Sequence, residues 1–257
     1  MNTTASDTEP TTTVALRSVS VAFGGLLALS DIDLDVAQGE RLAVLGPNGA
    51  GKTTLFNVVA GDIRPTSGSV HINGVDCTLL PSRRRPGLGV ARTYQRTRLF
   101  PGLTVEDNLY LAVVGRQGRH RSIRRTPIDE QWRIRARDAC EAVWLGDRLE
   151  SVVGDLSHGQ QRQLEVGMAM VTNPGLMMLD EPASGLSRGE RDRLIELLEA
   201  LAADVTLLLI EHDMDVALRV ADRVVVMADG RQVATGAPDE IRRSQVVRDV
   251  YLGGGTD

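Results

Sequence analysis

The chain is organised around the stretch Gly46-Pro47-Asn48-Gly49-Ala50-Gly51-Lys52-Thr53-Thr54. An apolar run, Leu42–Leu45, precedes it, and a segment with helical character, Thr54–Val59, follows it. The order of strand, glycine-rich loop and helix, with the spacing G-x-x-x-x-G-K-[ST], is typical of a phosphate-binding loop. We therefore take all nine residues as candidate contacts to a nucleotide.

The chemistry of a triphosphate explains these residue types. Several backbone N–H groups must converge on its oxygens, and glycines allow the chain to curl and approach closely. The positive end of the following helix adds to the attraction. Lys52 can reach the β- and γ-phosphates, and the Thr53 hydroxyl can ligate the Mg²⁺ ion that bridges them.

Two acids follow a continuous apolar run, Leu176–Leu179. This pattern is typical of a buried parallel strand whose carboxyl end meets a ligand. Asp180 can hold Mg²⁺, usually through water, and Glu181 can take a proton from an attacking water. The alternative is a strand that merely ends in a polar turn, and the phosphate-binding loop favours the functional interpretation.

Two further segments carry polar groups at the ends of predicted elements. His212 closely follows a second apolar strand, Val205–Ile210, where it could donate to a γ-phosphate or pair with the base. Ser157 and Gly159 stand at a predicted helix start and could donate hydrogen bonds to an anion. On its own, the second segment would be an ordinary helix cap.

The segment before the phosphate-binding loop predicts a β-hairpin. Apolar residues alternate from Val14 to Val36, which indicates antiparallel strands joined at Gly24-Gly25. Phe23 precedes this turn, and composition alone favours a place in the core for it.

The rest of the chain alternates between predicted helices and strands, which indicates a mainly parallel α/β core. Residues 82–95 are predicted to return to the sheet, and Thr104 to open an amphipathic helix. We expect a helix from Pro127 to Leu149, a hairpin from Val224 to Thr235 and one closing helix from Pro238 to Leu252. The expected anchors of the 127–149 segment are Trp132, Ile134, Val143 and Trp144.

Length and composition narrow the class of protein. The 257 residues suffice for one large domain with a subdomain, after a mobile tail at residues 1–12. The net charge of −5 argues against nonspecific nucleic-acid binding. Two distant cysteines favour a reducing, cytosolic setting, and no apolar run approaches the roughly 20 residues of a membrane span. The basic stretch Arg116–Arg125 could touch lipid headgroups, although such runs are more often solvated connections.

From Val14 to Gly253 the chain resembles the ATPase subunit of an ATP-binding cassette (ABC) transporter. Five motifs occur in the family's order: Walker A at Gly46–Thr53, the Q-loop glutamine Gln95, the signature Leu156-Ser157-His158-Gly159-Gln160, Walker B at Leu176–Asp180 with Glu181, and the switch histidine His212. The resemblance implies a P-loop NTPase core with a mainly parallel sheet, an N-terminal antiparallel β subdomain and an inserted helical subdomain at about 96–172. Residues 13–257 would then form a single ATPase domain.

The resemblance also implies roles for single residues. Phe23 would stack on adenine, which reverses the expectation from composition. Gln95 would serve catalysis and Mg²⁺, and Ser157, Gly159 and Gln160 would contact the ATP held by a second chain. Ser187 ends the family's D-loop where an acidic residue or Asn is usual, which puts communication between subunits in doubt.

A narrower resemblance points to a group of importers. Segments beginning at Phe23, Ala91 and Ile210, and the ending Tyr251-Leu252-Gly253, are similar to the larger ATPase of bacterial importers for branched-chain, hydrophobic amino acids. Gly167-Met168 stands where this group usually has Ala-Arg. Together with Ser157-His158-Gly159-Gln160, it is similar to the corresponding subunit of importers of urea and short amides. The transported solute therefore stays open.

By this resemblance the chain works at the cytoplasmic face of the membrane. Its partners would be a second ATPase chain, different or identical, two membrane-spanning permease subunits and, indirectly, an extracytoplasmic solute-binding protein. Rival classes are a soluble ABC ATPase of translation or DNA repair, and a P-loop GTPase or kinase. The single cassette, the lack of heptads between Lys52 and Ser157, and the lack of an Asn-Lys-x-Asp motif argue against them.

Overall fold

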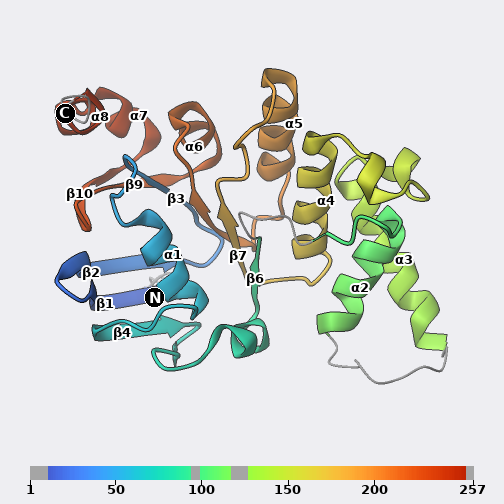
Figure 1. The fold of residues 1–257 in the computed structure, drawn as a ribbon, viewed down its shortest axis with the longest axis horizontal. Coiled ribbons are helices and arrows are strands. Elements are labelled where there is room, and N and C mark those ends of the chain that lie inside the picture. Colours follow the sequence, from blue (N-terminus) through green and yellow to red (C-terminus); the bar gives the residue numbers. More distant parts are fainter. Residues whose placement is uncertain (1–10, 94–98, 117–126, 253–257) are drawn as a thin grey trace, which may run out of the picture.

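The computed structural model describes residues 11–93, 99–116 and 127–252, arranged around two β-sheets (Figure 1). The smaller sheet is antiparallel, with the strand order β2-β1-β4-β5. Its strands are β1 (Thr12–Phe23), β2 (Leu26–Ala37), β4 (Ser67–Ile72) and β5 (Val75–Asp76). The predicted N-terminal hairpin is confirmed, and Thr12 belongs to the first strand instead of to the predicted tail.

The larger sheet has the order β10-β9-β3-β8-β7-β6 and is parallel except for the β9–β10 hairpin. Its strands are β3 (Arg41–Leu45), β6 (Val90–Arg92), β7 (Leu176–Asp180), β8 (Thr206–Ile210), β9 (Arg223–Ala228) and β10 (Arg231–Gly236). The predicted mainly parallel α/β core is thus confirmed. In the described part of the predicted segment 82–95, residues 82–93, a 3₁₀ helix, η1 (Ser82–Leu88), comes first and the strand is confined to Val90–Arg92.

Helices cover the larger sheet and extend beyond it. They are α1 (Lys52–Ala60), α2 (Val105–Arg116), α3 (Pro127–Ala142), α4 (His158–Met170), α5 (Arg188–Glu199), α6 (Met214–Val220), α7 (Pro238–Arg243) and α8 (Gln245–Leu252), with short 3₁₀ turns η2 (Gly146–Arg148) and η3 (Val153–Asp155). Figure 1 shows α2 and α3 on the far side of α4 from the sheet, where the three helices form an arm. No described helix is long and apolar enough to cross a membrane.

The central strand β3 is buried on both faces, as its apolar sequence predicts. Leu42 and Val44 pack into one core cluster with α1 and the antiparallel sheet. Ala43 and Leu45 pack into a second cluster, which includes α5, α6 and the helical arm. The phosphate-binding loop therefore leaves a strand that is held from both sides.

The structure corrects the predicted anchors of α3. Trp132 and Val143 are buried, whereas Ile134 is 48% exposed and Trp144 is 45% exposed. Ile134 lies two residues after Trp132, which turns it away from the buried face of a helix. Trp144 follows the end of the helix and has a positive φ of 56°.

The predicted closing helix is two helices. Ser244 between them is extended, with φ −64° and ψ 125°. The Ser244 hydroxyl accepts a hydrogen bond from the backbone N–H of Val247 at 3.4 Å, which makes it a cap for α8.

Candidate functional site: a phosphate-binding loop with carboxylates at two strand ends

The loop between β3 and α1 curls as the glycines predict. Gly46 and Gly51 have positive φ values of 148° and 95°. A Cβ at Gly46 would lie 2.2 Å from the Met227 carbonyl oxygen, and one at Gly51 would lie 2.7 Å from the Ala28 carbonyl oxygen. Glycine is therefore required at both positions by close backbone approach as well as by conformation.

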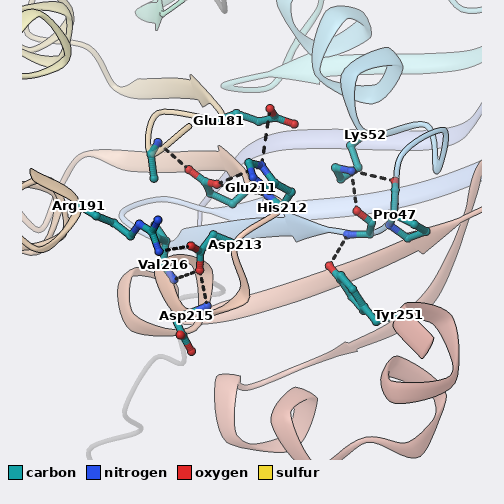
Figure 2. A network of polar contacts seen from close by, with 12 residues as sticks. Pro47, Lys52, Glu181, Arg191, Glu211, His212, Asp213, Asp215, Val216 and Tyr251 are labelled. Carbon is teal, nitrogen blue, oxygen red and sulfur yellow. Dashed lines mark hydrogen bonds and ion pairs between the residues drawn. The ribbon is translucent and has the colours of Figure 1, made fainter. Parts of the chain in front are cut away.

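Lys52 folds back over this loop (Figure 2). Its Nζ donates to the carbonyl oxygens of Gly46 at 2.6 Å and Pro47 at 3.0 Å. Burial lowers the pKa of Lys52, and the negative charges of Glu181 and Asp180 oppose that shift. The ammonium group is thus held at the loop, in a cleft that Glu181 also lines, and a phosphate bound at the loop would meet its positive charge.

A cleft of about 440 Å³ lies in front of the loop. Its lining brings together Phe23 at the end of β1, Asn48, Lys52 and Thr53 of the loop segment, and Glu181 after β7. Phe23 is 52% exposed, so the composition-based expectation of a core residue is wrong: Phe23 is the last residue of β1 and pairs with Leu26 at the turn end of the hairpin. The predicted loop residues from Asn48 to Thr54 all line this cleft.

Asp180 and Glu181 differ sharply in environment. Asp180 is buried, its Oδ1 has no hydrogen-bond partner among the described residues, and burial raises its pKa. Glu181 has a positive φ of 48°, and 26% of its side chain is exposed. An unpaired buried carboxylate oxygen costs free energy unless it meets a donor or a cation, so Asp180 fits a site for Mg²⁺, which prefers oxygen ligands.

His212 faces Glu181 across the end of the sheet (Figure 2). Its Nδ1 lies 3.7 Å from Glu181 Oε2, and 53% of its side chain is exposed. The strands β7 and β8 are parallel neighbours, with Asp180 paired to Ile210, which brings these side chains to the same edge. The two predicted residues are thus brought together.

Glu211 is a residue of this edge that the motifs do not single out. Its carboxylate is fully buried and accepts hydrogen bonds from the backbone N–H groups of Ala183 at 3.0 Å and His212 at 3.3 Å. Burial raises the pKa of Glu211 to about 7. The sequence does contain a signal for Glu211: like Asp180, it is an acid that directly follows a buried apolar run. Its bond to Ala183 holds the turn that carries Glu181.

The segment Ser157–Gln160 begins α4 and lies apart from the phosphate-binding loop. Ser157 caps the helix, and its backbone N–H donates to Gln160 Oε1 at 3.0 Å. Ser157, Gly159 and Gln160 line a separate cavity of about 190 Å³. One chain therefore does not bring these donors to its own phosphate-binding loop.

A carboxylate from α5 meets these donors. Glu190 Oε1 accepts hydrogen bonds from Ser157 Oγ at 3.2 Å and from the Gly159 N–H at 3.1 Å. Hydrogen bonds from Ser187, then from Gly159 and Ser157, lower the pKa of Glu190 to about 2. Within this chain the donors at the start of α4 are therefore paired with the carboxylate of Glu190, a residue that follows from no motif.

Ser187 performs the capping task at the start of α5. Its hydroxyl accepts from the Glu190 N–H at 3.4 Å and donates to Glu190 Oε2 at 2.8 Å. Serine caps helices about as well as Asp or Asn, so this departure from the family pattern keeps the local structure. The predicted residue Gln95 and the basic stretch after Arg116 lie outside the described residues.

The strand, loop and helix around Lys52, with acids at the ends of neighbouring strands, define a P-loop nucleotide-binding domain. A family model described as ABC transporter matches residues 29–184, and one described as branched-chain amino acid ATP-binding cassette transporter matches residues 231–257. The chain therefore belongs to the family of ABC transporter ATPases, which bind and hydrolyse ATP.

Curated relatives cover nearly the whole chain. The high-affinity branched-chain amino acid transport ATP-binding protein LivG of Salmonella typhimurium is 37% identical over 248 residues, covering 93% of this chain and 97% of LivG. BraF of Pseudomonas aeruginosa, with the same description, is 38% identical over 253 residues, covering 93% of this chain and 96% of BraF.

Solved structures agree with the fold. The ADP conformation of MJ1267, an ATP-binding cassette of an ABC transporter, has a TM-score of 0.83 and 26% identity, covering 94% of this chain and 99% of that chain. The dimeric bacterial ABC transporter cassette MJ0796 has a TM-score of 0.74 and 24% identity, covering 88% of this chain and 98% of that chain.

Proposed function

We propose that this chain is the ATP-hydrolysing subunit of an importer for branched-chain, hydrophobic amino acids, bound peripherally at the cytoplasmic face of the membrane. The names of LivG and BraF support the solute class, because both are branched-chain amino acid transport proteins and match along almost their whole length. The C-terminal match at residues 231–257 supports it independently of the phosphate-binding loop.

Glu181 is the general base in this proposal. Its side chain lines the cleft that also contains Lys52 and Thr53, so Oε2 can reach a water beside a bound γ-phosphate. His212, whose Nδ1 lies 3.7 Å from Glu181 Oε2, donates a hydrogen bond to the phosphate or pairs with the base. Gln95 is assigned the Q-loop role from its motif alone.

Thr53 and Asp180 are the residues that would hold Mg²⁺, with Gln95 as the third candidate. The Oδ1 of buried Asp180, for which the described part of the chain provides no hydrogen-bond partner, supports this assignment. When bound, the ion neutralises phosphate charge. Phe23 stacks on the adenine at the outer end of the same cleft.

The separation of the two nucleotide-binding motifs carries the proposal of a two-chain site. The phosphate-binding loop lines one cavity, and Ser157, Gly159 and Gln160 line another. Each ATP would lie between the loop of one chain and the signature of a second ATPase chain, different or identical. Residues 13–257 act as one ATPase domain, whose helical subdomain at about 96–172 moves with two permease subunits.

Reconstitution of the transporter tests the solute. The chain is copurified with its membrane partners and placed in vesicles that hold ATP on the inner side, which this chain faces. The solute-binding protein and the labelled solute are supplied on the outer side. Uptake of labelled leucine that is abolished by Glu181→Gln is the expected result. Uptake of urea or a short amide without leucine would overturn the solute class, and association with ribosomes or DNA in place of membrane proteins would overturn the importer.

A further inference from the structure

The last helix of the chain contacts the first residue of the phosphate-binding loop (Figure 2). The hydroxyl of Tyr251, in the last turn of α8, accepts a hydrogen bond from the backbone N–H of Gly46 at 3.0 Å. The two residues are 205 positions apart in the sequence. Burial raises the pKa of Tyr251, so the hydroxyl stays protonated and neutral at physiological pH.

Gly46 joins strand β3 to the loop. Glycine is soft at this φ of 148°, and the Met227 carbonyl oxygen packs against its Cα so closely that no side chain fits. The Gly46 carbonyl accepts from Lys52 Nζ at 2.6 Å. Tyr251 therefore fixes the N–H side of the same residue whose carbonyl positions Lys52.

The helix that carries Tyr251 is itself anchored. Val247 of α8 is buried in the core cluster that contains Leu45, and Val250 packs against that cluster. Ser244 caps the helix at its start. The Tyr251 hydroxyl is therefore brought to Gly46 by a helix that is packed against the core.

We propose that Tyr251 is a positioning residue for nucleotide binding and that α8 is a strap that holds the phosphate-binding loop in its curled form. Gly46 is buried, and a buried N–H without an acceptor costs free energy. Without the hydroxyl, the Leu45–Gly46 peptide unit would rotate to bring the N–H to another acceptor. That rotation would change the backbone angles at Gly46 and so shift the Gly46 carbonyl and, with it, Lys52.

The test is Tyr251→Phe in the full-length chain, because phenylalanine keeps the ring and removes only the hydroxyl. Loss of one such hydrogen bond should weaken Mg-ATP binding about three- to tenfold, measured by calorimetry. In the assembled transporter, KM for ATP should rise while kcat stays within about twofold, since the groups that act on the γ-phosphate are intact. Amide exchange at Gly46 should become faster.

Tyr110→Phe is the matched control. The Tyr110 hydroxyl contacts Asp129 at 3.2 Å within the helical arm, so this variant loses a tyrosine hydroxyl elsewhere and should bind ATP as wild type does. Tyr251→Leu, which also removes the ring, should bind ATP no better than Tyr251→Phe. If Tyr251→Phe binds ATP like wild type and only Tyr251→Leu is weakened, the ring packs and the hydroxyl positions nothing, which overturns the proposal. Unchanged exchange at Gly46 would overturn it as well.

Discussion

His212 Nδ1 lies 3.7 Å from Glu181 Oε2, beyond the reach of a direct hydrogen bond. The carboxylate is thereby left able to accept from another donor, such as a water poised beside a γ-phosphate. Glu181 is also the residue after β7 with a left-handed backbone, at φ 48°. The turn, held by Glu211 through the Ala183 N–H, aims the side chain into the cleft.

Glu181→Gln should slow ATP hydrolysis by the assembled transporter about 10²- to 10⁴-fold, because the amide keeps the shape but cannot take a proton. ATP binding should persist. Steady-state hydrolysis and equilibrium ATP binding measure the two effects. Glu196→Gln, an exposed acid on α5, is the control and should leave the rate unchanged. Near wild-type turnover of Glu181→Gln would refute the role as base.

Phe23→Ala should weaken ATP binding by about 0.5–1.5 kcal/mol beyond the lost contact area, the worth of a stacked ring. Because the Phe23 side chain is half exposed, the melting temperature of the Phe23→Ala variant should stay within about 2 °C of wild type. Phe100→Ala is the matched control, because Phe100 is 50% exposed at the helical arm. A lower melting temperature with unchanged ATP affinity would show that Phe23 contributes to packing and would contradict its stacking on adenine.

Glu211→Gln should change the pH dependence of stability. With a pKa of about 7 in the folded chain and 4.5 as its ordinary value, Glu211 holds a proton in the folded state that the unfolded state releases. Its contribution to stability is full below pH 4.5 and is lost as pH rises through 7. The free energy of unfolding of wild type relative to Glu211→Gln should therefore fall by on the order of 3 kcal/mol between pH 4.5 and pH 8. Denaturant titrations across this range test it, and a constant difference would contradict it.

Ser187→Ala should cost about 1 kcal/mol of stability through loss of the cap on α5. It should also raise the pKa of Glu190, because hydrogen bonds from Ser187 are the main cause of its low value of about 2. Carboxyl-carbon NMR titration and denaturant unfolding measure the two effects. Ser187→Asn should keep most of the stability, since asparagine caps equally well. An alanine variant as stable as wild type would show that the cap contributes nothing.

Local patterns in the sequence predict much of the fold and site. The phosphate-binding loop, the hairpins and the buried strands follow from spacing within a few residues, and the acids that end β7 follow from the strand itself. Phe23 could not be placed from composition, because its exposure depends on its position at the turn end of the β1–β2 hairpin, where it lines the cleft with residues of the loop. The break of the last helix was hidden because serine is tolerated in helices and also caps them.

The partners that complete the site come from distant parts of the chain. Glu190 of α5 accepts a hydrogen bond from Gly159 of α4. Glu211, which follows β8, accepts one from Ala183, which follows the neighbouring strand β7. Tyr251 of the last helix accepts one from Gly46. No spacing rule links these pairs, since they depend on how the elements pack. Their roles become visible only when the hydrogen bonds of each loop are followed to their acceptors.

The shared site is the central claim, and the rate of hydrolysis per chain as a function of protein concentration tests it most directly. The isolated chain should hydrolyse ATP poorly, because the γ-phosphate lacks the partner's signature donors until two chains close. The rate per chain should rise with concentration or on addition of the copurified partners, since ATP favours the dimer that binds it better. A fully active monomer, with a rate per chain independent of concentration and of the partners, would contradict the shared site.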